Sequence, residues 1–282
     1  MTPTGRRKLL SSLFVGFCAG AVLLALIPLA LILFFVISRG ILSLNLAFFT
    51  HMPTPVGEAG GGMANSIVGT LMLSGLAALM AVPIGVISGI YMSEYAGTRF
   101  AAAVRFAADT LNGVPSIVIG LFAYVVAVLP FQQFSAFAGG FALGLMMIPI
   151  IARTTEELLL LVPGTMREGA LALGATHARA VFTVVVPSAA QGIMTGIVLA
   201  IARIAGETAP LLFTSLNNRF FTTKLTQPIS SLTVQVYTYA SSPYQDQHRQ
   251  AWAGALVLVV IVLMCSLLAR FATRRLESMN SR

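Results

Sequence analysis

The chain has 282 residues, of which 57% are hydrophobic and 9% are charged, whereas a soluble globular chain carries about a quarter charged residues. This composition excludes an ordinary soluble domain and predicts one all-α polytopic membrane domain whose apolar surface contacts lipid. The formal net charge of +8 does not indicate a nucleic-acid partner, because the basic residues stand in small groups at the ends of apolar runs.

The first apolar run covers residues 13–37 and follows Arg6, Arg7 and Lys8. Its 25 uncharged residues exceed the roughly 7 to 15 apolar residues of a secretory signal. We therefore predict an uncleaved first transmembrane helix.

The later spans follow from length, since a helix needs about 20 apolar residues to cross the hydrocarbon core. On that criterion we expect them at residues 67–91, 111–129, 134–152, 189–216 and 251–269. With the first run, the sequence predicts six transmembrane helices.

Small residues and prolines stand inside these spans. Glycines four residues apart, at 16 and 20, 85 and 89, 140 and 144, and 192 and 196, favour close helix packing over a direct role in transport. Pro83, Pro115 and Pro149 remove backbone donors, so we expect those helices to kink or the freed carbonyls to find other partners. The stretch 112–116, Asn-Gly-Val-Pro-Ser, is the expected break, which could line a pathway or be strained packing.

The orientation follows from the 17 basic residues, of which 12 lie on the side of the N-terminus, while Arg203 lies within a span. The four on the other side are Arg39, Arg219, Lys224 and Arg249. Because cytoplasmic loops carry the excess of Lys and Arg, both termini are expected in the cytoplasm. The external connections are then residues 39–63 and 217–250, which are rich in Gly and Pro as loops are.

The connection between the fourth and fifth spans, residues 153–186, is too charged for the bilayer but has helical spacing of apolar residues. Thr165 and Glu168 have the spacing of a capping box, so a short helix is expected to begin there. Gly174 can end this helix in a left-handed conformation. Thr176 can cap a second short helix, residues 177–183, before Pro187, and we expect a compact cytosolic projection.

This connection carries a family resemblance. Glu168-Gly169-Ala170, then Gly174, then Val-Val-Val-Pro at 184–187 resemble the Glu-Ala-Ala loop of ABC importer permeases, the coupling helix that docks in a cleft of a separate ATPase. Gly169 departs from the pattern, in which Ala is usual, and Gly costs about 1 kcal/mol relative to Ala in a helix. The resemblance implies as ATPase-coupling residues Arg167, Glu168, Gly169, Ala170, Gly174, Arg179 and Pro187.

Within that family, further stretches resemble permeases for inorganic phosphate. They are GIMTGIVLAIARIAGETAPLLFTS at 192–215, PSIVIGLFAY at 115–124, RTTEELLLLVP at 153–163 and AWAG at 251–254. The resemblance implies a type I ABC importer permease fold in a bacterial inner membrane. It also implies the permease subunit of an ATP-driven phosphate importer, working by alternating access. A permease for sulfate or molybdate is the alternative, and an ATP-independent channel or secondary transporter is a weaker one.

The same resemblance divides the chain and names its partners. Residues 1–63 would be the first helix and a periplasmic loop, 64–271 the importer transmembrane domain with the coupling loop 165–187, and 272–282 a cytosolic tail. The partners would be a homologous second permease, two copies of an ATPase, and a periplasmic phosphate-binding protein.

No covalent chemistry is expected of the chain itself. A nucleotide-binding P-loop requires G-x-x-x-x-G-K-[ST], yet Lys8 and Lys224 are the only lysines and both precede leucine. ATP is therefore used by a separate polypeptide, and this chain is expected to bind no cofactor. No H-E-x-x-H metal motif occurs in the sequence.

Arg203 and Glu207 form the candidate site for the transported anion. An ionised side chain within a span is costly and marks function by default, and a separation of four residues would place both on one helix face. They could be a structural ion pair, or Arg203 could meet the passing anion through its planar fork. Thr208, Asn112 and Ser116 are weaker candidates for the pathway. Arg153, Thr154, Thr155 and Glu156 are expected to form a solvated helix end, with a coupling role as the alternative.

Overall fold

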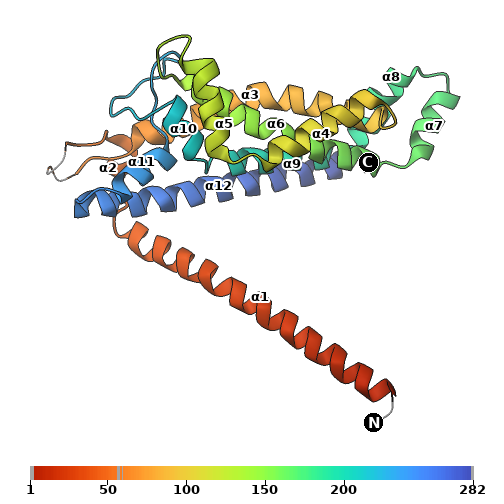
Figure 1. The fold of residues 1–282 in the computed structure, drawn as a ribbon, viewed down its shortest axis with the longest axis horizontal. Helices are drawn as coiled ribbons and strands as arrows, with labels where there is room; N and C mark the ends of the chain where they lie inside the picture. Colours follow the sequence, from red (N-terminus) through yellow and green to blue (C-terminus); the bar gives the residue numbers. More distant parts are fainter. Residues whose placement is uncertain (1–2, 56–57, 59, 281–282) are drawn as a thin grey trace.

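The computed structural model describes residues 3–55, 58 and 60–280, and side chains in that part except at 3–6, 8, 9 and 268–280. Over these residues the chain consists of helices and loops, without a strand (Figure 1). Five helices are long and apolar enough to cross a membrane, and a sharply bent helix pair makes a sixth candidate among the described residues. The predicted all-α class is confirmed.

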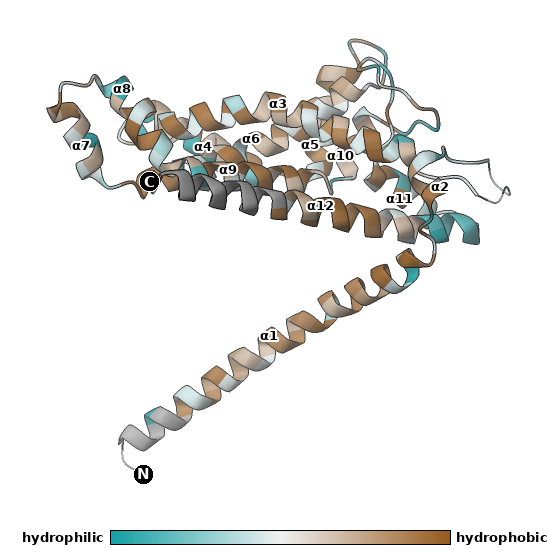
Figure 2. Cartoon of the chain, turned by 180° about the vertical axis from the view of Figure 1, so that it is seen from behind, coloured by the Kyte–Doolittle hydropathy of each residue, from teal (hydrophilic) through white to brown (hydrophobic). Residues whose placement is uncertain are grey.

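Helix α1 (Pro3–Ile41) is the first predicted span, and it diverges from the rest of the molecule (Figures 1 and 2). Its apolar side chains are exposed along most of its length, as expected of a helix surrounded by lipid or by other membrane helices. It meets α12 (Gln245–Asn280) near Gly40, where an added Cβ would lie 2.8 Å from the Cβ of Leu256. The absence of a side chain at Gly40 therefore permits this contact.

The main core lies between α3 (Ala64–Glu94), α6 (Ala136–Leu160) and α9 (Val186–Ile204). Six of the eight glycines predicted to serve packing do so within this core. An added Cβ at Gly85 or Gly89 of α3 would collide with α6, and one at Gly192 or Gly196 of α9 would collide with Leu158 or Thr154 of α6. Gly140 and Gly144 of α6 receive Leu76 and Met80 of α3 in the same way. Nothing lies within 4 Å of such a Cβ at Gly16 or Gly20.

The third predicted span is not one helix. Residues 111–113 belong to α4 (Arg99–Gly113), and α5 (Ser116–Ala123) with the π-helical turn η1 (Tyr124–Val128) follows at an angle of 106°. The break falls at Val114 and Pro115, within the predicted stretch 112–116. Pro83 and Pro149, by contrast, lie inside helices that continue, because neighbouring helices hold both halves in place.

The two connections that were predicted to be external loops contain helices. Residues 39–63 include α2 (Leu46–Thr50), and residues 217–250 include α11 (Leu232–Ala240), which packs on α12. A second apolar cluster joins these parts, with Phe48, Met63 and Leu232 at its centre. The segment 217–231, which we call the external segment, reaches the start of α3, where Ser66 and Ser230 share a hydrogen bond of 2.7 Å.

The end of α12 lies close to the base of the projection formed by α7 (Gly164–Ala172) and α8 (His177–Ala180), whereas the start of α1 lies apart from both (Figure 1). The tail predicted at 272–282 continues α12 as far as Asn280, and residues 281–282 lie outside the described part. Of the basic residues used for orientation, the side chains of Arg6, Lys8, Arg270, Arg274, Arg275 and Arg282 also lie outside it.

Candidate functional site

Two interrupted helices meet in the half of the molecule that carries the external segment. The first interruption is at Pro115, before α5, and the second separates α9 from α10 (Ala209–Thr214). Helices α5 and α10 pack together, and an added Cβ at Gly120 would lie 2.5 Å from the Cα of Pro210. Both interruptions therefore lie within a few residues of one helix contact.

The second interruption corrects the predicted geometry of Arg203 and Glu207. The fifth span was expected to be helical over 189–216, but α9 ends at Ile204 and Glu207 lies in the connection that follows. Gly206 stands in this connection, and glycine is a poor helix former. Arg203 and Glu207 therefore do not share a helix face, and among the described side chains they form no ion pair within 4 Å.

The five pathway candidates lie on or beside the interrupted helices. Arg203, in the last turn of α9, and Asn112, near the end of α4, are exposed. Ser116 begins α5, and Thr208 immediately precedes α10; both are partly buried, as is Glu207. The backbone carbonyl of Glu207 accepts a hydrogen bond of 2.9 Å from the Thr233 hydroxyl of α11, which ties the interruption to the external part of the chain.

The coupling loop begins differently from the prediction. Helix α7 starts at Gly164 after Pro163, and no side chain caps it, so Thr165 lies inside the first turn and the capping box is wrong. Pro163 explains the early start, because it disfavours helix at the residue before it and its own fixed φ suits the residue that precedes a helix.

The end of α7 follows the prediction. Gly174 has φ +85°, the amide of Ala175 donates to the carbonyl of Ala170 at 3.2 Å, and that of Gly174 donates to Leu171 at 2.9 Å. This is the Schellman pattern, which satisfies two free carbonyls at a helix end. Thr176 caps the next helix by accepting from the Arg179 amide at 3.4 Å.

The second short helix is not separate from the fifth span. From α8 the chain passes through a π-helical turn, η2 (Val181–Val185), directly into α9, and His177–Ile204 forms one 28-residue span. Pro187 stands at the start of α9. A π-helical turn precedes Pro187. The helical backbone therefore continues through the proline, and no helix ends there.

Most of the predicted coupling residues lie on the surface of this projection. Glu168, Gly169, Gly174, Arg179 and Pro187 are exposed. Ala170 and Arg167 are partly buried. Leu173, which the sequence analysis did not single out, is 91% exposed at the end of α7. No other large apolar side chain in the described part of the chain is exposed to this extent.

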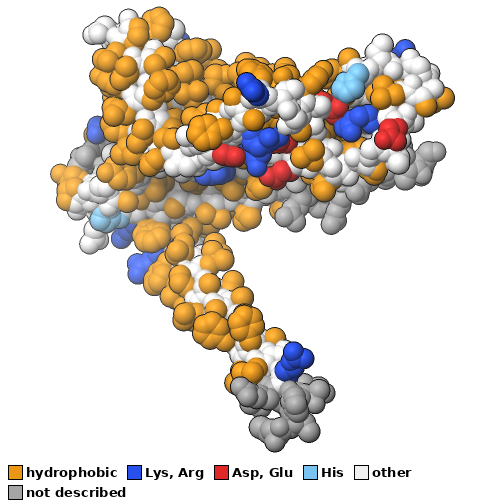
Figure 3. All heavy atoms as spheres, turned by 45° about the vertical axis from the view of Figure 1, so that its right-hand side comes forward, with side chains coloured by type: hydrophobic (Ala, Val, Ile, Leu, Met, Phe, Trp, Pro, Cys, Tyr) orange, Lys and Arg blue, Asp and Glu red, His pale blue; other side chains and the backbone are white. Residues whose placement is uncertain are grey.

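A buried charge cluster near the C-terminal end of α6 corrects the expected solvated end of the fourth span. Helix α6 continues to Leu160, and Glu156 is buried, with its side chain 2% exposed. Its Oε1 accepts from Arg105 Nε at 2.8 Å and its Oε2 from Arg153 Nη1 at 2.6 Å, while Arg153 Nε lies 3.0 Å from Asp109 Oδ1. Figure 3 shows acidic and basic side chains gathered on this face. Arg105 and Asp109 stand four residues apart between the second and third predicted spans. This helical spacing of opposite charges could have indicated α4, but it was not used in the prediction.

A second buried carboxylate links the coupling loop to the membrane helices. Glu94, the last residue of α3, is 3% exposed at its side chain. Arg167 Nη2 of α7 lies 2.6 Å from its Oε1, and His177 Nε2 of α8 lies 3.3 Å from its Oε2. Sequence reasoning missed Glu94, which we had placed beyond the end of the second span.

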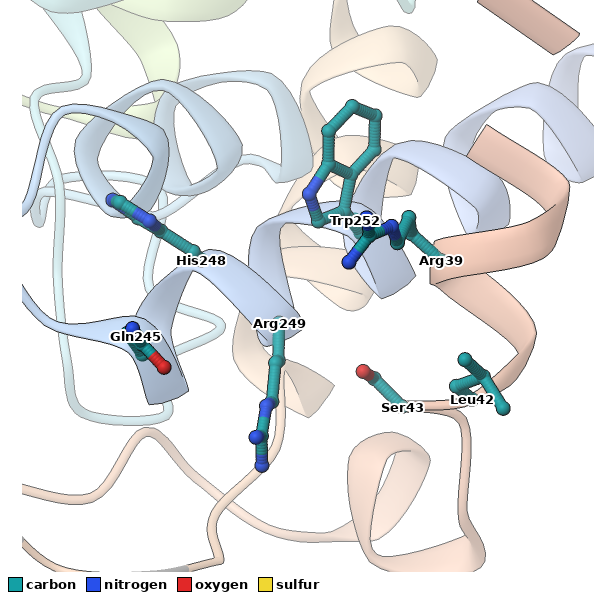
Figure 4. Close-up of a pocket in the computed structure, with 7 residues that line it drawn as sticks. All are labelled: Arg39, Leu42, Ser43, Gln245, His248, Arg249 and Trp252. Carbon is teal, nitrogen blue, oxygen red and sulfur yellow. The ribbon is translucent and has the colours of Figure 1, made fainter. Parts of the chain in front are cut away.

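A pocket of about 550 Å3 lies elsewhere, at the junction of α1 and α12. Figure 4 shows Arg39, from the end of α1, and Arg249, from the start of α12, at this pocket. Both arginines were predicted on the external side, and the structure brings them to one place. No group of three or more His, Cys, Asp or Glu side chains suited to a metal ion occurs in the described part of the chain.

The chain is similar to known transport proteins. Residues 81–279 match the family described as "Binding-protein-dependent transport system inner membrane component". The chain is 43% identical over 265 residues to the phosphate transport system permease protein PstA of Haemophilus influenzae, covering 94% of each chain. It is 47% identical over 240 residues to the PstA of Yersinia pestis, covering 85% of this chain and 81% of that protein.

A solved structure has the same fold at low sequence identity. A chain of a bacterial alginate ABC transporter, in complex with a periplasmic protein that carries an alginate pentasaccharide, aligns with a TM-score of 0.66 and 15% identity. The alignment covers 96% of both chains. This likeness establishes the fold of an ABC importer permease for nearly the whole chain.

Proposed function

Because this chain belongs to the family of binding-protein-dependent transport system inner membrane components, we propose that it is the permease subunit of an ATP-driven importer of inorganic phosphate. It is a multi-pass protein of the bacterial inner membrane. The observation that carries the proposal is the similarity to two phosphate transport permeases over 85% and 94% of the chain.

The projection formed by α7 and α8 binds the ATPase of this importer. Its tip carries Leu173, and Glu168 and Arg179 are exposed beside it. ATP is bound and hydrolysed by a separate ATPase, and this chain holds no cofactor and performs no covalent chemistry. Closure of the ATPase dimer on ATP moves the projection. The transmembrane helices then open the pathway to one side of the membrane and afterwards to the other.

The partners would be those of a complete phosphate importer. They are a second, homologous permease, PstC, two copies of the ATPase PstB, and the periplasmic phosphate-binding protein PstS. The similarity to phosphate transport permeases supports this set.

Arg203 would meet the phosphate on its way through the membrane. Its guanidinium is exposed in the last turn of α9, and no carboxylate lies within 4 Å of it among the side chains that the structure describes. A planar guanidinium binds phosphate oxygens through two parallel hydrogen bonds. Glu207, Thr208, Asn112 and Ser116, all on or beside the interrupted helices, are the further candidates for the pathway.

Transport by the reconstituted complex tests the proposal. The chain is purified with the second permease and the ATPase, placed in liposomes, and supplied with the phosphate-loaded binding protein. We expect ATP hydrolysis to be stimulated and phosphate to be accumulated, with sulfate and molybdate unable to compete. Competition by either anion, or accumulation without ATP, would contradict the proposed substrate or the proposed energy source.

The exposed tip gives a second test. We expect Leu173→Glu to weaken ATPase binding about 30-fold, because removing a central apolar anchor from an interface costs about 2 kcal/mol or more. Titration of the complex of the two permease subunits with the ATPase measures this change in affinity.

Gly169→Ala is a companion variant, which introduces the residue usual in the family, and an added Cβ there meets nothing within 4 Å. It also removes a helix penalty of about 1 kcal/mol. We expect binding equal to or tighter than that of the unmodified chain. If the Leu173→Glu variant binds the ATPase as tightly as the unmodified chain does, the tip of the projection does not contact the ATPase.

A further inference from the structure

The carboxylate of Glu94 is shared between both helices of the coupling loop. One oxygen contacts Arg167 of α7 at 2.6 Å and the other lies 3.3 Å from His177 of α8. A buried carboxylate with a charged partner is costly to leave unpaired. The two short helices are therefore attached to the end of α3 at one point.

Aromatic side chains lie beside this point. Tyr91 stacks on Tyr95 with ring centroids 4.9 Å apart, and Tyr95 lies 6.0 Å from the ring of His177. Water is largely kept from Glu94, whose side chain is 3% exposed. Shielding of this kind strengthens an electrostatic contact compared with one on an open surface.

Helix α3 extends from this point to the other end of the molecule. Its 31 residues span about 46 Å, and it makes its most extensive contact with α6 (Figure 1). Since Glu94 is its last residue, a displacement of the coupling loop acts directly on the end of α3.

At its opposite end, α3 is joined to the external segment. Besides the bond between Ser66 and Ser230, the Thr70 hydroxyl accepts from the Leu232 amide at 2.8 Å. Gly69 leaves no room for a side chain, because an added Cβ would lie 1.9 Å from the Ser230 carbonyl oxygen. Next to Leu232, Thr233 bonds to the Glu207 carbonyl.

We propose that Glu94 is the positioning residue through which the coupling loop moves α3, and that α3 carries this movement to the external segment and to the interruption at Glu207. The proposal rests on the proposed function, since it requires an ATPase acting on the loop. Glu94 touches neither ATP nor phosphate; it converts docking at the loop into movement of a membrane helix.

The test is the ratio of phosphate transported to ATP hydrolysed by the complete complex in liposomes. Glu94→Gln keeps the shape of the side chain and removes its charge. We expect it to lower this ratio about 5-fold or more, the lower range of coupling between distant sites, at an unchanged amount of assembled complex. Arg167→Gln is expected to have the same effect, and the double variant no larger one, because both changes break one link.

Two further variants sharpen the result. Thr70→Val, at the other end of α3, is expected to lower the same ratio, since it removes the acceptor of the Leu232 amide. Glu157→Gln is the matched control at the cytosolic end of α6, with a side chain 69% exposed, and it should leave the ratio unchanged.

The outcomes separate this inference from the proposed function. An unmodified complex that does not couple ATP hydrolysis to phosphate uptake would overturn the proposed function. A coupled unmodified complex with an unchanged ratio in Glu94→Gln would overturn only the role of Glu94. Fully multiplicative effects of Glu94→Gln and Arg167→Gln would also overturn it, because the two side chains would then act independently.

Discussion

Replacing Arg203 by glutamine is expected to lower phosphate uptake about 10- to 100-fold while the complex still assembles. Hydrogen bonds to a charged group contribute about 1.5 to 3 kcal/mol net, and each 1.4 kcal/mol is a factor of about ten. Because the Arg203 side chain is exposed in the isolated chain, its loss leaves no buried partner unpaired within the described part of the fold. The initial rate of labelled phosphate uptake, divided by the amount of assembled complex, measures the effect.

Two further arginine variants test whether the planar guanidinium at position 203 is required for phosphate uptake. Arg203→Lys keeps the charge but not the planar fork, so we expect an intermediate rate. Arg249→Gln removes a 71% exposed arginine whose acidic neighbour, Asp246, lies 3.9 Å away, and uptake should be unchanged. If Arg203→Gln transports at the unmodified rate, Arg203 is not part of the pathway.

The second large effect is expected at Glu156. Glu156→Gln removes the negative charge that lies between Arg105 and Arg153 and leaves both guanidinium groups facing a neutral side chain. Breaking a fully buried ion pair costs about 3 to 5 kcal/mol, but the side chains of both arginines are 29% exposed, so we expect a smaller loss of about 1 to 3 kcal/mol. The variant should lose monodisperse complex at a lower temperature than the unmodified protein, as followed by size-exclusion chromatography after heating.

The adjacent residue provides the control. Glu157 has the same side chain on the same helix but is 69% exposed, and its contact with Arg153 is 4.0 Å. Surface ion pairs of this kind contribute about 0 to 1 kcal/mol, so Glu157→Gln should hardly change the temperature of loss. Equal behaviour of the two variants would show that the charge cluster does not hold α4 against α6.

The sequence was sufficient for features that depend on local composition. The apolar run at 13–37 predicted α1, and the glycines at 85 and 89 predicted a close helix contact, which the structure places between α3 and α6. The break around Pro115 and the left-handed Gly174 also followed, because proline disfavours helix at the residue before it and glycine permits a positive φ at a helix end.

The features that were missed depend on contacts between distant parts of the chain. Glu156 was expected in water because it follows the predicted end of a span, yet α6 continues and α4 supplies Arg105. Glu94 likewise acquires its role only when α7 and α8 fold back onto α3. Hydropathy along one helix carries no information about a partner 51 or 73 residues away.

The candidate site was predicted in part. The sequence identified Arg203 as a charge within a span, and the structure leaves it exposed near an interruption. It did not predict that the helix ends at Ile204, since Ala205 is a good helix former and the packing of α10 against α5 decides where the next helix begins. The pairing expected from helical spacing was therefore wrong.

The dimensions of α1 constrain how this chain sits in a bilayer. Its uncharged part, residues 13–37, has 25 residues and is about 38 Å long, whereas the hydrocarbon layer is about 30 Å thick. A helix of this length can tilt in the bilayer or extend its ends into the interfacial layers. The more α1 tilts, the further its two ends lie from each other in the plane of the membrane.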